Sequence, residues 1–412
     1  MRLKAETAVY GGYVIARNHS DDMGVVFIKG AVPGETVLVE IAERKRDYSI
    51  ATVKEVIEPS PSRVKAPCPY FGRCGGCQLQ HASYREQVAM KSAILSDALK
   101  RLGGIETEQA EPLYGPQFGY RKRAQFKVSG YGGNKGNKGE IGFYREGTRE
   151  VVPIGDCPNL TSRLNESLIK VREMNSLKGI KELHLTDGDG IIALIRGREF
   201  DETLAEDFIR AGFDGVAFEN DSYRGKGHVL YDLLGLKYSV SPYSFFQSNW
   251  ELNLKLVNIL KEGLSPLKDK KVLEIYAGGG NFSLPLAGEA GKITAVEENP
   301  YSVKDGLRNV ELNSIKNVKF IKSPVEKFLS GNGREFDIVI ADPPRPGLSK
   351  EALSRLLELL PERIAYISCN PSTLARDLKK LASKYRVDSV RMVDFFPNTF
   401  HIEAISFLSL VK

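Results

Sequence analysis

The sequence has no long apolar run. No segment reaches the roughly 18 consecutive apolar residues that span a bilayer, and the opening MRLKAETAVYGG lacks the apolar core of a secretory signal. These absences argue against a membrane-spanning or secreted protein, so we expect a soluble, cytoplasmic one. With 412 residues, 42% of them apolar, the chain is long enough for two or three domains that each bury a core.

Cysteine is also scarce, with five in the whole chain, which is too few for a disulfide framework. An odd number of cysteines in a reducing compartment points instead to metal binding or catalysis. Cys68, Cys74 and Cys77 form a tight group with glycines between them, Cys157 follows at a distance beside a proline, and Cys369 stands alone. Four thiolates can bind an iron–sulfur cluster or a zinc ion. This spacing favours the cluster over zinc, and over two pairs of free thiols that bind no metal.

The excess of positive over negative charge is small for the whole chain, with a net charge of +6. Residues 1–57 carry eight basic and eight acidic side chains and so have no net charge. Residues 121–149 hold eight basic and two acidic residues, a surplus equal to that of the entire chain. Rings that could stack on bases lie in and beside this stretch: Tyr120, Phe126, Tyr131, Phe143 and Tyr144. By composition alone, an RNA-binding surface and a solvated sheet face with a hairpin at 132–139 are equally good interpretations.

The pattern of the chain predicts three domains. Residues 1–57 read as short strands between glycine and proline turns, which is typical of a small β-barrel. A proline-rich linker then enters residues 58–240, where a helix at 84–102 is followed by strands and a helix at 160–175, so we expect an α+β domain. In residues 241–412, apolar strands alternate with helices, which predicts a doubly wound, Rossmann-like α/β domain with a parallel sheet.

Two motifs of the third domain indicate a nucleotide-type ligand. The run YAGGGN at 276–281 follows the strand at 271–275, and Glu297 ends the next strand, where an acid typically takes ribose hydroxyls. These features fit a dinucleotide or S-adenosylmethionine, but the Gly-x-Gly-x-x-Gly spacing of nicotinamide sites is not met. The sequence DPPR at 342–345 follows a third strand, and Arg345 there favours hydrogen bonds to carbonyl or phosphate oxygens.

A possible nucleophile lies at the same sheet edge. Cys369 ends the strand at 363–368 and precedes a helix at 372–381, whose N-terminus is expected to lower the thiol pKa from about 8.5. The alternative is a small buried apolar residue, the usual role of a lone cysteine. Near the C-terminus, Glu403 adds a carboxylate that by itself reads as a surface charge.

Taken together, these motifs resemble the RNA uracil-C5 methyltransferases that use S-adenosylmethionine. The resemblance covers essentially the full length. It rests on the segments 244–249 (SFFQSN), 342–348 (DPPRPGL), 368–371 (SCNP) and 394–403 (DFFPNTFHIE). The segments 11–17 (GGYVIAR) and 30–35 (GAVPGE) resemble a TRAM domain, an OB-like barrel that binds RNA.

The resemblance implies a role for each candidate residue. Cys369 would be the nucleophile and Glu403 the general base. S-adenosylmethionine would contact Gln247, Tyr276, Asn281, Glu297 and Asp342, and a [4Fe-4S] cluster would be held by Cys68, Cys74, Cys77 and Cys157. The candidates for contact with a flipped uridine are Arg345, Arg121, Arg123 and Phe126.

The expected reaction is methylation of a uridine of 23S rRNA through a covalent adduct between Cys369 and C6. The alternative within the class is uridine 54 of tRNA, and a 5-methylcytosine enzyme is a remote one. A noncatalytic iron–sulfur RNA-binding protein would explain the barrel and the cysteines but not Cys369 and Glu403 in their motifs. We expect neither a membrane nor an obligate protein partner.

Overall fold

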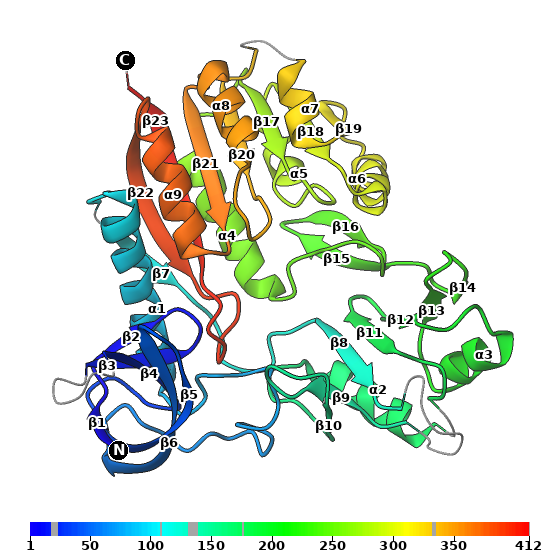
Figure 1. Cartoon of the computed structure of the whole chain (residues 1–412). Helices are drawn as coiled ribbons and strands as arrows, with labels where there is room; N and C mark the ends of the chain where they lie inside the picture. The colour runs from blue at the N-terminus through cyan, green and yellow to red at the C-terminus, as the bar shows by residue number, and fades with distance from the viewer. Residues whose placement is uncertain (18–23, 108, 131–138, 175–176, 332–334, 412) are drawn as a thin grey trace.

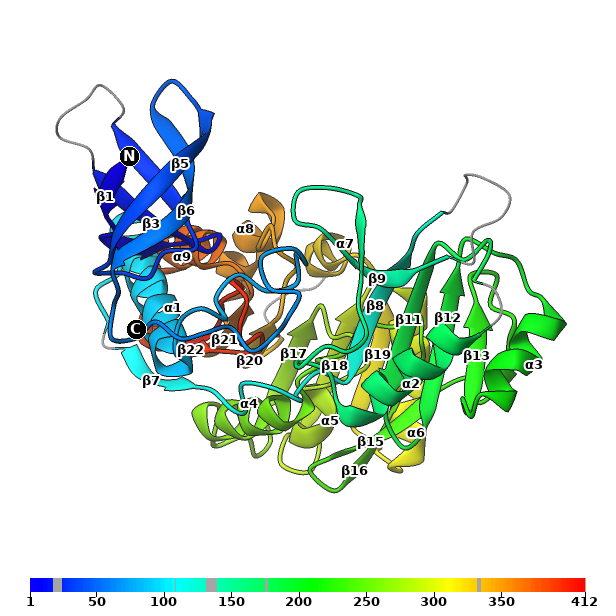
Figure 2. The ribbon, with the colours of Figure 1, turned by 90° about the horizontal axis from the view of Figure 1, so that it is seen from below.

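The computed structural model describes residues 1–17, 24–107, 109–130, 139–174, 177–331 and 335–411. Its elements fall into three units, an N-terminal sheet, a central unit and a C-terminal unit (Figure 1 and Figure 2). In the part of the chain so described, no helix has the length and apolar character needed to cross a membrane.

The N-terminal unit is a curled six-stranded sheet with the order β1-β5-β6-β4-β3-β2 (Figure 2). Its strands are β1 (Arg2–Lys4), β2 (Thr7–Val9), β3 (Tyr13–Arg17), β4 (Val25–Lys29), β5 (Thr36–Arg44) and β6 (Tyr48–Glu58). Alternate residues such as Val14, Val26 and Ile28 are buried inside the curl. Buried Glu35 accepts hydrogen bonds from the Val32 N–H (2.8 Å) and from Arg63 (2.7 Å), which fastens the proline linker to the sheet.

The central unit is a seven-stranded sheet in the order β10-β9-β8-β11-β12-β13-β14, with helices α2 and α3 packed against its core. The strands are β8 (Arg123–Val128), β9 (Ile141–Tyr144), β10 (Val151–Pro153), β11 (Glu182–Asp187), β12 (Ile191–Arg196), β13 (Gly215–Phe218) and β14 (Tyr223–Gly225). Helix α2 (Ser162–Glu173) begins after the N-cap Thr161, and α3 (Glu202–Arg210) begins after Asp201. The mixed α+β character matches the sequence-based prediction.

The C-terminal unit has an eight-stranded sheet, β19-β18-β17-β20-β21-β23-β22-β7. Its strands are β7 (Gln109–Leu113), β17 (Lys271–Ile275), β18 (Lys292–Glu297), β19 (Val318–Lys322), β20 (Ile338–Ala341), β21 (Arg363–Ser368), β22 (Tyr385–Val393) and β23 (Glu403–Leu410). Its other helices are α4 (Trp250–Gly263), α5 (Ser283–Leu286), α6 (Pro300–Leu312), α7 (Val325–Ser330), α8 (Lys350–Leu359) and α9 (Pro371–Leu381). The five strands from β19 to β21 are parallel, as expected, but β23 inserts antiparallel between β21 and β22.

The C-terminal unit also takes in two segments that we expected in the central domain. Strand β7 pairs with β22, and helix α1 (Tyr84–Ala98), which continues as a π-helical turn over Leu99–Gly103, packs against α9 and β22. The hairpin of β15 (Val229–Leu233) and β16 (Leu236–Val240) shares a core with α4 and β17. These parts of residues 58–240 therefore belong to the C-terminal unit. The hydrophobic periodicity of a segment predicts that a helix or strand forms there, but it does not predict which sheet that element packs against.

Candidate active site

The carboxyl ends of β17, β18 and β20 meet at one edge of the C-terminal sheet, where ligands bind in open α/β folds. Tyr276 directly follows β17 with a φ of 61°, and Gly278 continues the turn with a φ of 54°. The N–H of Gly278 donates a 2.9 Å hydrogen bond to the carboxylate of Glu297 at the end of β18. This bond ties the glycine turn to the acid that the sequence assigns to ribose.

A pocket at this edge brings together four of the five residues predicted to bind the cofactor. The pocket is lined by Gln247, Tyr276, Asn281 and Asp342, together with Phe245 and Phe246. Glu297 does not line the pocket itself but accepts a hydrogen bond from Gly278, which does. The Oε1 atom of Gln247 is buried without a hydrogen-bond partner among the described residues. Burial raises the pKa of Asp342 to about 7. An unpartnered buried acceptor and a desolvated carboxyl are groups that a polar ligand would satisfy.

Asn281 contributes to the same pocket in a constrained position. Its amide exchanges two hydrogen bonds with Asn253 of α4, at 2.7 and 2.9 Å. Because both amides are engaged, Asn281 shapes the wall of the pocket. Sequence reasoning missed Phe245, which lines the pocket with a side chain that is 67% exposed.

Cys369 and Glu403 lie side by side because their strands are neighbours. Ser368 at the end of β21 pairs with Ala404 of the antiparallel strand β23. Cys369, which follows Ser368, therefore lies beside Glu403, which precedes Ala404. Burial raises the pKa of Glu403 to about 8, with a further increase from Asp342. Arg345 opposes this change and lowers the pKa of both Glu403 and Cys369.

The pKa of the Cys369 thiol differs from the expectation. Burial raises it to about 11, and the nearby carboxyls of Glu403 and Asp342 raise it further, although α9 begins directly after the thiol. The prediction of a lowered thiol pKa is therefore wrong. The helix N-terminus is outweighed because the thiol shares its enclosed site with two acids.

Arg345 is exposed and lies close enough to Cys369 and Glu403 to act on their pKa values. Its guanidinium Nη2 is 3.3 and 3.4 Å from the two ring nitrogens of His401. Burial lowers the pKa of His401 to about 4, and the charge of Arg345 lowers it further. His401 is consequently neutral at neutral pH and can lie against the arginine without repulsion.

The other three candidates for substrate contact are placed differently. Arg123 donates to the backbone carbonyls of Ser244 and Pro242, the latter at 2.7 Å, so it braces the segment that leads to Gln247. Phe126 is fully buried, and its ring stacks on that of Phe143 at 5.1 Å. The expectation that these two residues contact RNA is not met, because one guanidinium is committed to carbonyls and one ring to the core.

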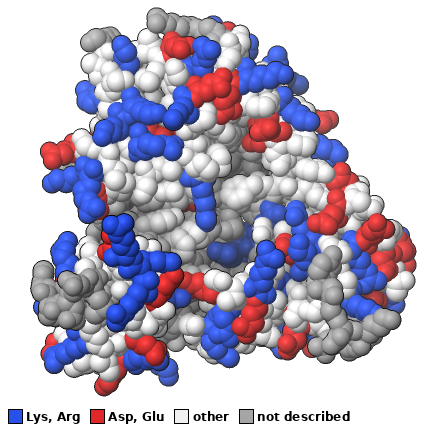
Figure 3. Space-filling model, in the orientation of Figure 1, with Lys and Arg blue, Asp and Glu red and all other residues white. Residues whose placement is uncertain are grey.

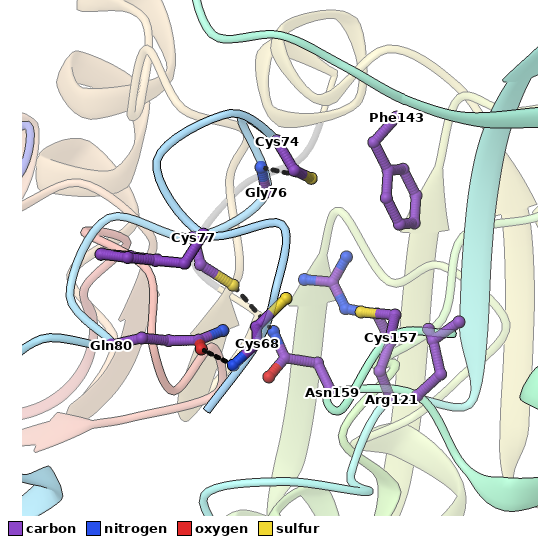
Figure 4. A pocket seen from close by; sticks show the side chains of 11 residues that line it. Cys68, Cys74, Gly76, Cys77, Gln80, Arg121, Phe143, Cys157 and Asn159 are labelled. Atoms are coloured by element: carbon purple, nitrogen blue, oxygen red, sulfur yellow. Dashed lines mark hydrogen bonds between the residues drawn. The ribbon is translucent and has the colours of Figure 1, made fainter. Parts of the chain in front are cut away.

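The four cysteines that the sequence groups as ligands line one cavity of about 70 Å³, shown in Figure 4: Cys68, Cys74, Cys77 and Cys157. Arg121 lines the same cavity. Burial raises the pKa of each of the four thiols, that of Cys157 to about 12. Among the residues that the structure describes, no three His, Cys, Asp or Glu side chains are grouped closely enough to hold a metal ion.

The surface offers a hollow between the units. Figure 3 shows it with Lys and Arg side chains on its floor and along parts of its rim. Part of the basic stretch, including Tyr131, Lys135 and Lys138, lies outside the described residues.

Comparison with known proteins agrees with this arrangement. The family model of tRNA (uracil-5-)-methyltransferases matches residues 232–411. A protein of Methylococcus capsulatus named 23S rRNA (uracil(1939)-C(5))-methyltransferase RlmD is 36% identical over 93% of this chain and 92% of its own. An uncharacterized RNA methyltransferase of Aquifex aeolicus is 35% identical over 100% of this chain and 98% of its own.

A solved structure extends the match to the fold. The tRNA (uracil-54, C5)-methyltransferase of Pyrococcus abyssi, in complex with S-adenosyl-L-homocysteine, has a TM-score of 0.78 and 25% identity, with 99% of this chain and 100% of the other covered. The likeness spans all three units and not only the Rossmann-like one. From the full-length relatives and the site at the sheet edge together, the chain belongs to the family of RNA (uracil-C5)-methyltransferases.

Proposed function

We propose that the enzyme methylates C5 of a uridine in 23S rRNA through a covalent adduct, with Cys369 as nucleophile and Glu403 as base. The observation that carries this proposal is the placement of these two residues on adjacent strands, next to the pocket that contains Asp342. Uridine 54 of tRNA is the second candidate, favoured by the fold of the archaeal relative. The ribosomal target is preferred because the named relative at 36% identity acts on 23S rRNA.

S-adenosylmethionine is the proposed methyl donor, since the solved relative holds S-adenosyl-L-homocysteine. When bound, it supplies an electrophilic methyl group. Gln247 offers its unpartnered Oε1 to the ligand, and Asp342 offers a carboxyl whose raised pKa would fall beside a cationic ligand. Glu297, which accepts a hydrogen bond from Gly278, would bind the ribose hydroxyls, and Tyr276 and Asn281 line the pocket walls.

The residues at the edge divide the chemistry between them. The Cys369 thiolate adds to C6 of the uracil, which makes C5 nucleophilic enough to take the methyl group. Glu403 then accepts the proton of C5, the C5–C6 double bond re-forms and the thiolate leaves. Arg345, whose charge acts on Cys369, would hold a uracil carbonyl as its charge develops. A carboxyl with a pKa of about 8 is well matched to proton abstraction near neutral pH.

The reaction requires a base turned out of folded RNA. The basic hollow between the units is a suitable place for the RNA backbone, because phosphate contacts supply most of the sequence-independent affinity (Figure 3). We further propose that the enzyme is cytoplasmic and acts without an obligate protein partner.

We propose a [4Fe-4S] cluster for the cavity of Cys68, Cys74, Cys77 and Cys157. A single zinc ion would require all four sulfur atoms within about 2.3 Å of one point, whereas each thiolate of a cluster binds a different iron atom. The proposal rests on the four thiols lining one cavity and on the spacing of the four cysteines in the sequence. Its role would be structural, and cluster-free protein should lose RNA affinity before catalytic competence; unchanged affinity and folding would contradict that role.

The mechanism is tested with Cys369→Ala and Glu403→Gln. We expect Cys369→Ala to abolish transfer of labelled methyl groups into RNA. Glu403→Gln should instead accumulate a covalent RNA–protein adduct, visible as a slowly migrating band on a denaturing gel. Full activity of Cys369→Ala would overturn the adduct mechanism, and digestion of the product to nucleosides separates 5-methyluridine from 5-methylcytosine.

The target is tested by mass mapping of RNA from a strain that lacks the gene. A missing 5-methyluridine in 23S rRNA would support the ribosomal assignment, and a missing one in the tRNA T-loop would replace it. If 5-methyluridine is still present in both RNAs, both candidate targets are contradicted.

A further inference from the structure

Asn398 occupies the middle of the loop 394–402, which connects β22 to β23 and leads directly into Glu403. The residue is fully buried and has a φ of 68°. Asparagine tolerates this left-handed conformation better than most side chains do. A buried polar residue five positions before the proposed base therefore has to find its partners inside the protein.

The side chain of Asn398 uses its full hydrogen-bonding capacity. Its Nδ2 donates to the backbone carbonyl of Gln117 (3.0 Å) and to Oδ1 of Asn159 (2.9 Å). Its Oδ1 accepts from Nε2 of Gln117 (2.8 Å) and Nε2 of Gln87 (3.3 Å). The backbone N–H of Asn398 donates to Oε1 of Gln87 at 2.8 Å. Four separate hydrogen bonds thus fix one amide.

Two routes connect Asn398 to the cysteine cavity. The backbone carbonyl of Asn398 accepts hydrogen bonds from the N–H groups of Gln78 (3.0 Å) and Leu79 (2.9 Å), which directly follow Cys77. The second route runs through Asn159, which accepts from Asn398 and donates from Nδ2 to the Sγ of Cys77 at 3.2 Å. Figure 4 shows the Asn159 side chain reaching this thiol.

The rest of the loop is fixed on the side of the active site. Lys91 of α1 forms a buried ion pair with Asp394 (2.7 Å) and donates to the carbonyl of Phe396 (3.0 Å). Beyond Asn398, the loop places His401 against Arg345, and Glu403 follows in β23. Because the loop is held at its start and middle, displacement of Asn398 has to be taken up by the segment that ends at Glu403.

We propose that Asn398 is a positioning residue that links the cysteine cavity to the catalytic base. It fixes the 394–402 loop so that Glu403 is held where it can take the C5 proton from the methylated adduct. The inference rests on the proposed function of Glu403 and goes beyond it, because it gives the cysteine cavity an effect on one step of the reaction. That step is proton removal and release of the Cys369 thiolate, not the earlier addition to C6.

Asn398→Gly tests the proposal without imposing strain, because glycine adopts positive φ readily and keeps the backbone hydrogen bonds. We expect kcat to fall by about 10- to 100-fold, since misplacement by about 1 Å can cost 10²-fold. The fraction of enzyme trapped as the covalent RNA adduct should rise severalfold, because the first step continues while the last slows. Asn317→Ala is the matched control, since Asn317 makes two hydrogen bonds to the backbone carbonyls of Ala287 and Ala290, and it should leave the adduct fraction unchanged.

Asn159→Ala removes the side-chain route to Cys77 and should raise the adduct fraction in the same way. The double variant Asn159→Ala/Asn398→Gly should have an adduct fraction no higher than that of the more defective single variant. The reason is that each substitution removes the same hydrogen bond between Asn398 and Asn159. Adduct formation and turnover that fall in parallel in Asn398→Gly, with no trapped adduct, would make Asn398 merely structural and overturn the proposal. If Glu403→Gln traps the adduct while Asn398→Gly does not, only this inference fails; if neither traps it, the assignment of Glu403 fails as well.

Discussion

Three acidic groups lie close together at the carboxyl edge of the C-terminal sheet. Burial raises the pKa of Asp342 to about 7, that of Glu403 to about 8 and that of Cys369 to about 11. With a pKa this high, the Cys369 thiol is protonated at neutral pH. A cationic methyl donor beside Asp342 would favour the thiolate, so binding of the donor and activation of the thiol are coupled.

The coupling between Glu403 and Cys369 gives a testable pH dependence. Glu403→Gln removes a negative neighbour that raises the thiol pKa, so the pKa of Cys369 should fall toward its ordinary value. At pH 8 to 9 the variant should then react faster with iodoacetamide at Cys369 than the unmodified enzyme does, because alkylation requires the thiolate. Peptide mass spectrometry resolves this thiol from the other four.

The control for this measurement is Glu262→Gln, which changes a carboxylate at the end of α4. It should leave the alkylation profile unchanged. An equal rate at Cys369 in Glu403→Gln and the unmodified enzyme would show that the carboxyl does not act on the thiol.

Residue positions could be predicted from the sequence where strand ends decide them. Cys369 and Glu403 were predicted as a pair from their motifs, and the pairing of β21 with β23 brings them together. Arg123 and Phe126 were not predictable, because the alternation of a strand does not tell which face is covered. The thiol pKa was mispredicted because a helix N-terminus is visible in the sequence, whereas burial beside two acids is not.

At the scale of elements, helix α1 shows how far local patterns reach. The predicted helix at 84–102 corresponds to α1, which ends at Ala98, together with the π-helical turn that continues to Gly103 and is capped by Gly104 with a φ of 64°. Its place in the C-terminal unit was not predictable. The buried face of α1 includes Gln87 and Lys91, polar residues that resemble a solvent-exposed face in any sequence pattern.

Lys91→Met tests this buried face. The substitution leaves Asp394 buried without its cation, which costs about 3–5 kcal/mol when one partner of a buried pair is removed. We expect a lower midpoint for the thermal unfolding transition that includes the C-terminal unit, measured by calorimetry at pH 7. Adding Asp394→Asn should recover part of the loss, because the unpaired charge disappears. A double variant as unstable as the sum of both single variants would contradict an energetically coupled pair.

For the whole molecule, the sequence predicted three folding patterns but not how they dock. The N-terminal sheet approaches the catalytic edge through Tyr10, whose ring meets that of Phe400 at 5.5 Å and 84°. Burial raises the pKa of Tyr10, Arg345 lowers it, and Cys369 raises it further, so the tyrosine is within electrostatic reach of the active site. Such contacts join residues nearly four hundred positions apart, and neither partner carries a local signal of the other.

Tyr10→Ala separates a docked N-terminal sheet from one that is only tethered. Loss of an edge-to-face aromatic pair is worth about 0.5–1.5 kcal/mol, so kcat/KM for RNA should fall by up to about tenfold while the affinity for S-adenosylmethionine stays unchanged. The matched control is Tyr48→Ala, which removes a comparable pair with Phe27 (5.3 Å) inside the same sheet and away from Phe400. If both variants lower kcat/KM equally, the sheet contributes to RNA binding without being docked at the active site. A loss confined to Tyr10→Ala means that the docked sheet forms part of the wall around the flipped base.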